Sequence, residues 1–184
     1  MLVFIKDSLE RNLMYKKILI ATDGSKHINR AAPIIIGFHK KWGSKIVIFH
    51  SIKHMLKKVS PTSPNLTIPY DANSYLTGRV ISQPMLIKGV DEPEIQRLSF
   101  SEVFTIAQNI LTEKKAIFDE VQVPAKIKLV KNDNPEDYIQ KVAKKYDLIV
   151  IGIKGVHSKL SQVFLGSVAE AVVKNAPCDV MVIR

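Results

Sequence analysis

Cysteine, arginine and long apolar runs are scarce in this sequence, and the shortages exclude several classes of protein. Cys178 is the only cysteine among the 184 residues, so the chain can form neither an intramolecular disulfide nor a cysteine cluster that binds zinc. No apolar run approaches the roughly 18 residues that a membrane-spanning helix requires. A disulfide-stabilised secreted scaffold and a membrane protein are therefore excluded, and we expect no membrane partner.

The positive charge of the chain comes mainly from lysine. Arginine supplies only five of the 27 basic residues, which face 17 acidic residues and leave a net charge of +10 with a pI near 9.6. Such a charge favours anionic partners. The lysines are spread along the whole chain, however, whereas a nucleic-acid interface usually clusters its basic residues. We therefore interpret the charge as a solvated surface and do not expect nucleic-acid binding.

The first residues do not have the pattern of an export signal. The apolar run at residues 2–5 is shorter than the core of a signal peptide, and no small-residue cleavage site follows it. The residues from Met14 onward lead directly into an apolar strand, which makes Met14 an alternative start. We expect residues 1–14 to form a flexible extension, residues 15–184 a single domain, and the protein to be cytoplasmic.

Apolar runs alternate with helical patterns along the rest of the chain. The apolar runs predict strands at residues 18–22, 45–51, 127–130, 148–151 and 180–183, and the first of them is wholly apolar, as in strands buried on both faces of a parallel sheet. Helical patterns lie between them, at residues 29–42, 103–121, 135–146 and 167–175. Pro33 leaves two possibilities for the first helix, which either begins near Asn29 or is kinked at the proline. This order of elements predicts a doubly wound α/β fold.

Residues 53–100 differ in composition from the rest of the chain. They contain five of the nine prolines, separated by serine, threonine and asparagine. A structureless segment of this length is uncommon inside a compact domain. We predict a long proline-rich insertion in the domain, in which residues 75–81 and 85–87 are compatible with a small hairpin.

Glycines between the fourth predicted strand and the last helix indicate an anion site. Gly152 and Gly155 follow the strand, and Gly166 precedes Ser167 at the start of the helix. Glycine lets backbone N–H groups approach a phosphate, and a helix N-terminus offers N–H groups without partners. The alternative is that the glycines only form a tight turn. Neither a Walker loop nor the dinucleotide-binding glycine motif occurs.

Several segments, taken together and in order, resemble the universal stress protein family. They are the opening strand and turn Lys16-Lys-Ile-Leu-Ile-Ala-Thr-Asp-Gly-Ser25 and the second strand Val47-Ile-Phe-His-Ser51. The glycines at 152, 155 and 166, with Ser167, are similar to the signature of the ATP-binding branch of the family. Residues 177–183 resemble the closing strand. The match spans residues 15–184.

The resemblance implies a Rossmann-like fold of the adenine nucleotide alpha hydrolase-like type, with a five-stranded parallel sheet in the order 3-2-1-4-5 and usually a homodimer. It also implies ATP at the switch point of the sheet, often with Mg or Mn on the nucleotide. The residues matching those that hold adenine and ribose are Ala21, Thr22, Asp23 and Ser51. The residues expected near the phosphates are Ile151, Gly152, Lys154, Gly155, Gly166, Ser167 and Val168.

Two departures from the family pattern bear on nucleotide binding. The spacer at residues 156–165 is one residue longer than in the signature, and Asn132-Asp133-Asn134 replaces a glycine that usually precedes the third helix. Every glycine of the signature itself is present, so we expect the chain to bind nucleotide.

Three functions follow as alternatives. The first is a stress-response regulator whose affinity for an unidentified protein partner depends on bound ATP. The second is a weak ATPase or adenylate-transferring enzyme, although no Ser/His/Asp set or carboxylate pair predicts catalytic residues. The third is a dimeric stress scaffold that no longer binds nucleotide. In each case we expect a homodimer through residues 180–183, because an apolar edge strand tends to pair across a two-fold axis.

Overall fold

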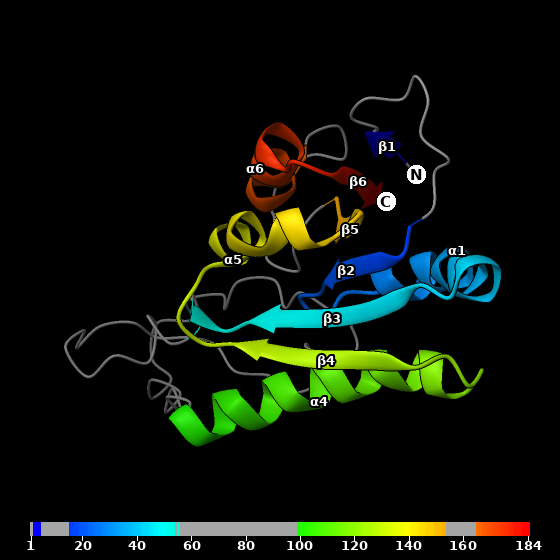
Figure 1. Cartoon of the computed structure of the whole chain (residues 1–184). Helices are drawn as coiled ribbons and strands as arrows, with labels where there is room; N and C mark the ends of the chain where they lie inside the picture. The colour runs from blue at the N-terminus through cyan, green and yellow to red at the C-terminus, as the bar shows by residue number, and fades with distance from the viewer. Residues whose placement is uncertain (1, 5–14, 54, 56–98, 154–164) are drawn as a thin grey trace, which may run out of the picture.

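The computed structural model has one sheet with helices on both faces (Figure 1). It describes residues 2–4, 15–53, 55, 99–153 and 165–184. Its strands are β1 (Leu2–Phe4), β2 (Lys17–Ala21), β3 (Lys45–Ser51), β4 (Ala125–Val130), β5 (Leu148–Gly152) and β6 (Asp179–Ile183). Its helices are α1 (His27–Trp42), α4 (Phe100–Asp119), α5 (Pro135–Val142), the 3-10 turn η1 (Ala143–Lys145) and α6 (Ser167–Asn175).

The sheet has the predicted topology. Its strand order is β1-β6-β5-β2-β3-β4, and the last five of these strands are parallel to their neighbours. Numbered among themselves along the chain, those five strands follow the order 3-2-1-4-5, so the predicted doubly wound fold is confirmed. From β2 the chain first adds strands on one side of the sheet (β3 and β4) and then on the other side (β5 and β6). The position beside β2 where the order reverses is the switch point, at which ligands of such sheets bind.

The two faces of the sheet carry separate cores. Alternate residues of a strand point to opposite faces, so Ile18 and Ile20 of β2 pack with α1 and α4 while Leu19 packs with α5 and α6. All three side chains are fully buried. Their burial explains why this strand has a continuous apolar sequence, as expected for parallel strands covered on both sides.

Two helices differ in detail from the prediction. Helix α1 begins at His27, so Pro33 lies in its interior and the predicted start near Asn29 is wrong. Helix α4 begins earlier than predicted because Ser99 and Glu102 form a capping box. It ends at Asp119, before the predicted end at residue 121, and Val121 is 44% exposed.

The N-terminal residues correct two expectations. Residues 1–14 were expected to form a flexible extension, yet Leu2–Phe4 forms β1 and pairs antiparallel with β6, with Val3 opposite Met181. The apolar run at the start of the chain therefore finds a partner in the sheet. As a result β6 is not an edge strand, and the edge that was expected to carry a dimer contact is covered by the chain's own β1. Strand β4 forms the other edge, where Lys126 and Lys128 are exposed.

Most of the proline-rich insertion lies outside the described residues, and so does the predicted hairpin at 75–87. Within the part of the chain that the structure describes, no helix is both long enough and apolar enough to cross a membrane.

The pairing of β1 with β6 predicts that the first residues control self-association. A chain that lacks residues 1–13 and begins at Met14 would expose the backbone of β6, whose five residues are all buried in the full chain. We expect this shorter chain to dimerise more strongly than the full chain, because an uncovered apolar edge pairs with a second copy. Light scattering at micromolar concentrations measures the masses, and equal masses for the two chains would contradict the prediction.

Candidate functional site

The candidate site lies at the carboxyl edge of the sheet, where β2, β3 and β5 end side by side. Ile20 is in register with both Ile48 and Val150, so the turns that follow these strands meet at one place. From here the chain enters α1 on one face of the sheet after β2, and it reaches α6 on the other face after β5. The site is therefore bordered by the beginnings of two helices.

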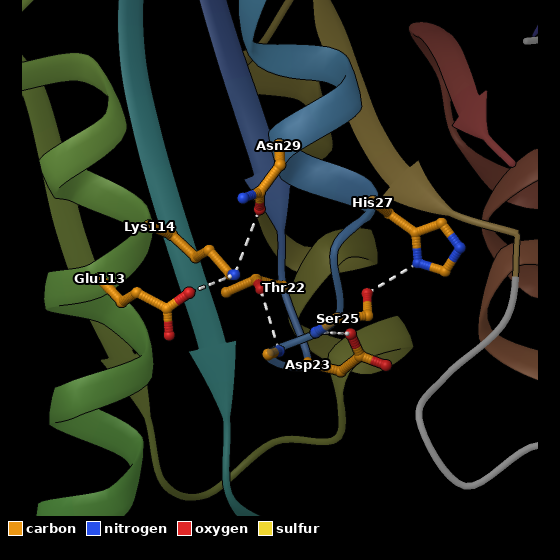
Figure 2. Close-up of polar contacts among 8 residues, drawn as sticks. Thr22, Asp23, Ser25, His27, Asn29, Glu113 and Lys114 are labelled. Carbon is orange, nitrogen blue, oxygen red and sulfur yellow. Dashed lines mark hydrogen bonds and ion pairs between the residues drawn. The ribbon is translucent and has the colours of Figure 1, made fainter. Parts of the chain in front are cut away.

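The turn after β2 is held by short-range hydrogen bonds (Figure 2). The Thr22 hydroxyl accepts a hydrogen bond from the Gly24 backbone N–H at 3.1 Å, and the Asp23 carboxylate accepts one from the Ser25 N–H at 3.0 Å. Gly24 has a φ of +91°, which favours glycine. A side chain there would also approach Ile110 of α4. The Asp-Gly-Ser sequence thus fixes where α1 begins.

Both helices that border the site begin without a side-chain cap. Lys26 is the N-cap of α1 and Gly166 is the N-cap of α6, and neither contributes a capping side-chain hydrogen bond. The first turn of α1 contains no acidic residue. In the first turn of α6, Glu170 forms an ion pair with Lys174. Backbone N–H groups without capping acceptors, together with the positive ends of two helix dipoles, favour an anion at this edge.

A backbone hydrogen bond connects β5 to the start of α6. The Gly166 N–H donates to the Ile153 carbonyl at 2.7 Å, and the Ile153 N–H donates to the Ile183 carbonyl at 2.7 Å. The first and last parts of the glycine signature, at Gly152 and at Gly166, are thereby brought close together. Ser167 is exposed at the first position of α6, so its hydroxyl is available to a ligand.

Ser25 and His27 form a polar pair that the sequence analysis missed. The Ser25 hydroxyl lies 2.7 Å from Nδ1 of the His27 imidazole. Burial lowers the pKa of His27, the Asp23 carboxylate raises it, and the Arg30 guanidinium lowers it. The only local signal was a histidine two residues after the serine of the turn, and a pattern this short does not predict a contact.

The imidazole of His27 explains why residue 152 is glycine. A Cβ added to Gly152 would lie 2.7 Å from Nδ1 and 2.9 Å from Cγ of His27, which is too close for unbonded atoms. The ring therefore packs directly against the end of β5. Phosphate approach and a tight turn were the two reasons expected for this glycine, and its contact with His27 adds a packing reason.

His50 and Ser51, at the end of β3, are used for internal contacts. Nδ1 of His50 donates to the Thr22 carbonyl at 2.7 Å, and its buried Nε2 has no hydrogen-bond partner among the described residues. Burial lowers the pKa of His50, the main effect, although the bond to Thr22 and the Asp23 charge raise it. The Ser51 hydroxyl donates to the Asp133 carbonyl at 2.5 Å. The hydroxyl proton of Ser51 is thus used within the chain, and its oxygen can serve a ligand only as an acceptor.

The segment Asn132-Asp133-Asn134, which stands where the family pattern has a glycine, leads directly into α5. Asn134 is the N-cap of α5, and Pro135 is its first residue, as predicted. The Asn134 side chain makes no capping bond, however, and instead donates to the Asp137 carboxylate at 3.1 Å.

The structure brings most of the expected site residues to one edge. Those described are Ala21, Thr22, Asp23, Ser51, Ile151, Gly152, Gly166, Ser167 and Val168. Of these, Thr22, Ser51, Ile151 and Gly166 are buried. Lys154 and Gly155 lie outside the described residues. Among the described residues, no group of three His, Cys, Asp or Glu side chains is placed to hold a metal ion.

A separate cavity lies at the opposite, amino edge of the sheet. It has a volume of about 760 Å³, and its lining includes Lys17, Lys45, Lys126 and Lys145. Helices α1 and η1 end near this cavity, which also borders His39 and Tyr146. Of these four lysines, Lys145 lies in the last turn of η1, where a positive charge is favourable at the carboxyl end of a helix.

Comparisons with known proteins agree with the fold. The sequence model of the Universal stress protein family matches residues 14–184. A universal stress protein of Methanocaldococcus jannaschii is 27% identical over 98% of this chain and 90% of its own length. One from Thermus aquaticus is 27% identical over 93% and 100%, and a protein of Staphylococcus haemolyticus named as a putative universal stress protein is 30% identical over 94% and 86%.

Solved structures show the same architecture. A universal stress protein from Archaeoglobus fulgidus in complex with dAMP has a TM-score of 0.55 and 18% identity, with 93% of this chain and 99% of the other covered. A universal stress protein in complex with cAMP has a TM-score of 0.52 and 17% identity, with 93% and 98% covered. At these identities the likeness shows the fold alone.

The contact between Gly152 and His27 predicts a coupled effect on stability. Replacing Gly152 with Ala should lower the free energy of unfolding by about 1–3 kcal/mol, because the new Cβ forces the imidazole to move. In a chain that already carries His27→Ala, the same change should cost much less. Urea unfolding of the parent, both single variants and the double variant measures the coupling. Additive effects would show that the ring and the glycine do not interact.

The burial of His50 predicts a loss of stability in mild acid. Its pKa in the folded chain lies below the value of about 6.5 expected when unfolded. The unfolded state therefore binds the proton more readily than the folded state. The free energy of unfolding is highest above about pH 6.5 and decreases as the pH falls from there toward the lower pKa of the folded chain. Each unit of lowering corresponds to about 1.4 kcal/mol. His50→Asn, which keeps a donor for Thr22, should show a smaller difference between unfolding at pH 7.5 and at pH 5.5. An unchanged difference would exclude His50 as the source.

Proposed function

We propose that this chain, which belongs to the universal stress protein family, binds an adenine nucleotide at the carboxyl edge of its sheet. The observation that carries the proposal is the meeting of two uncapped helix N-termini, those of α1 and α6, beside the ends of β2 and β5. A phosphate chain would satisfy N–H groups that the N-cap residues Lys26 and Gly166 leave without a side-chain acceptor. The two structural neighbours that hold dAMP and cAMP support the choice of an adenine nucleotide.

The expected roles of the residues follow from their positions. The polar turn from Thr22 to Ser25 and the backbone at Ser51 border the space for base and ribose. Gly152, Gly166 and Ser167 border the space for phosphates, where Ser167 offers an exposed hydroxyl. We propose ATP as the ligand because the complete glycine signature provides N–H groups for more than one phosphate. A Mg or Mn ion would take oxygen ligands mainly from the phosphates themselves.

The proposed role is that of a stress-response regulator whose partner affinity changes with bound nucleotide. Such a switch requires that the nucleotide bind two states of the protein unequally. Weak ATP hydrolysis is the second candidate, and the Ser25–His27 pair favours it because an imidazole beside a hydroxyl can accept a proton. Steady phosphate release that is abolished by His27→Asn at saturating ATP, where the variant is still occupied, would support hydrolysis. Its absence with bound ATP would support the regulator.

We also propose a homodimer through β6, with the condition that β1 first leaves this strand. Because β1 pairs with β6, two copies could pair through β6 only after β1 leaves that edge. A nucleotide-dependent displacement of β1 would connect binding to assembly, and the mass of the full chain with and without ATP tests this connection.

Two substitutions in the glycine signature test nucleotide binding. Ser167→Ala should remove one hydrogen bond to a charged group, about 1.5–3 kcal/mol or roughly ten- to a hundred-fold in affinity. Gly155→Val should weaken binding more, because a branched side chain would occupy space that close backbone approach needs. Calorimetry with ATP and magnesium chloride measures both affinities, and circular dichroism checks the fold.

Ser101→Ala is the matched control, because Ser101 is also exposed in the first turn of a helix but lies on α4. It should bind ATP like the parent. If both test variants also bind like the parent, the glycines serve only as turn residues. If the parent itself binds no nucleotide, the scaffold function replaces the proposal.

A further inference from the structure

His27 is not part of the glycine signature, yet its imidazole contacts a glycine of that signature. It lies at the first position of α1, and its ring packs on Gly152 at the end of β5. The two borders of the proposed phosphate site, the start of α1 and the end of β5, therefore meet at this one side chain. Figure 2 shows the ring beside the end of β5, with its second nitrogen directed away from Ser25.

The hydrogen bond to Ser25 decides what the ring can offer a ligand. Nδ1 lies 2.7 Å from the Ser25 hydroxyl, so this nitrogen already has a partner. A hydroxyl can donate to a neutral imidazole or accept from a protonated one. In the protonated ring, Nδ1 donates to Ser25 and Nε2 becomes a second donor. A protonated His27 would thus present a charged N–H group at the carboxyl edge without losing its internal bond.

We propose that His27 is a phosphate-binding residue of the nucleotide site and that it takes up a proton when the nucleotide binds. The inference rests on the proposed function, since it names a further ligand of the same site. One proton moves from solvent to the imidazole, whose Nε2–H then donates to a phosphate oxygen. No covalent bond forms or breaks.

The charged residues around His27 act on its pKa in opposite directions. Among the described residues, Asp23 favours the protonated ring while Arg30 opposes it, and Gly152 of β5 brings no charge. Arg30 also donates to the Arg184 carbonyl at the end of β6, at 2.7 Å. Glu170 of α6 is paired with Lys174. Burial is the largest effect and keeps the pKa of His27 below its usual value, so an arriving phosphate would supply the charge that shifts the balance toward protonation.

The experiment follows the protonation of His27 directly. An NMR titration of its Cε1–H resonance in the full chain, with and without ATP and magnesium chloride, measures the pKa in both states. We expect ATP to raise it. Calorimetry at pH 7.5 in two buffers of different ionisation enthalpy should also show net proton uptake on binding. The terminal phosphate of ATP titrates near pH 6, so proton uptake is taken as the difference between the parent and His27→Asn.

His27→Asn should weaken ATP binding about ten- to a hundred-fold at pH 6.5, the range for a hydrogen bond to a charged group. At pH 8.5, where the ring is neutral, the loss should be much smaller. His39→Asn is the matched control, since Nδ1 of His39 also bonds within the chain, to the Ser44 carbonyl at 2.8 Å, but lies at the amino edge. It should change neither the affinity nor the proton count.

Two results would overturn the inference and leave nucleotide binding intact. One is an equal affinity and proton count for His27→Asn and the parent. The other is tighter binding by His27→Asn, which would mean that the ring excludes the phosphate. If the parent binds no ATP, the proposed function fails and this inference fails with it.

Discussion

The central position of β2 is the constraint on which the rest of the structure depends. It pairs with β3 on one side and with β5 on the other, and Ile18, Leu19 and Ile20 are fully buried between the two helical layers. Burying a side chain of this size contributes about 1.5–3 kcal/mol, so truncating even one of the three would remove a large fraction of the roughly 5–15 kcal/mol net stability of a domain. Because its register is fixed, the turn at its carboxyl end and the first residue of α1 are fixed as well.

Local signals in the sequence were sufficient for most of the fold. Apolar runs predicted all five parallel strands. In β2 the run is continuous because a strand buried on both faces needs no polar alternation, whereas β4, at the edge, contains exposed lysines and Ile127 is 37% exposed. The bounds of β3 and α6 agree with the prediction at both ends. Strand β1 was not predicted, since an apolar run as short as residues 2–5 does not indicate a strand unless the strand it pairs with is known. Its partner β6 lies at the other end of the chain.

Some residues of the candidate site were likewise predictable from the sequence, and others were not. Gly152, Gly166 and Ser167 were recognisable because glycine at a strand end and at a helix start has a local reason. His27 was not, because its contact with Gly152 exists only after β2 and β5 have paired. Lys114 is a second example. It lies on the apolar face of α4 with a side chain only 2% exposed, and its ammonium group bonds to Asn29 at 3.3 Å and Glu113 at 2.8 Å. Helical spacing identifies the buried face of α4, but it does not reveal an acceptor on α1.

The two edges of the sheet determine how far any assembly could grow. A filament built by strand pairing requires each molecule to offer two different free edges. Here the β4 edge carries exposed lysines, which oppose pairing with another chain, and the β6 edge is open only when β1 has left it. Two copies joined through β6 would each use up their single available edge. Growth would therefore stop at two chains, and the lysines on the β4 edge would protect against open-ended aggregation.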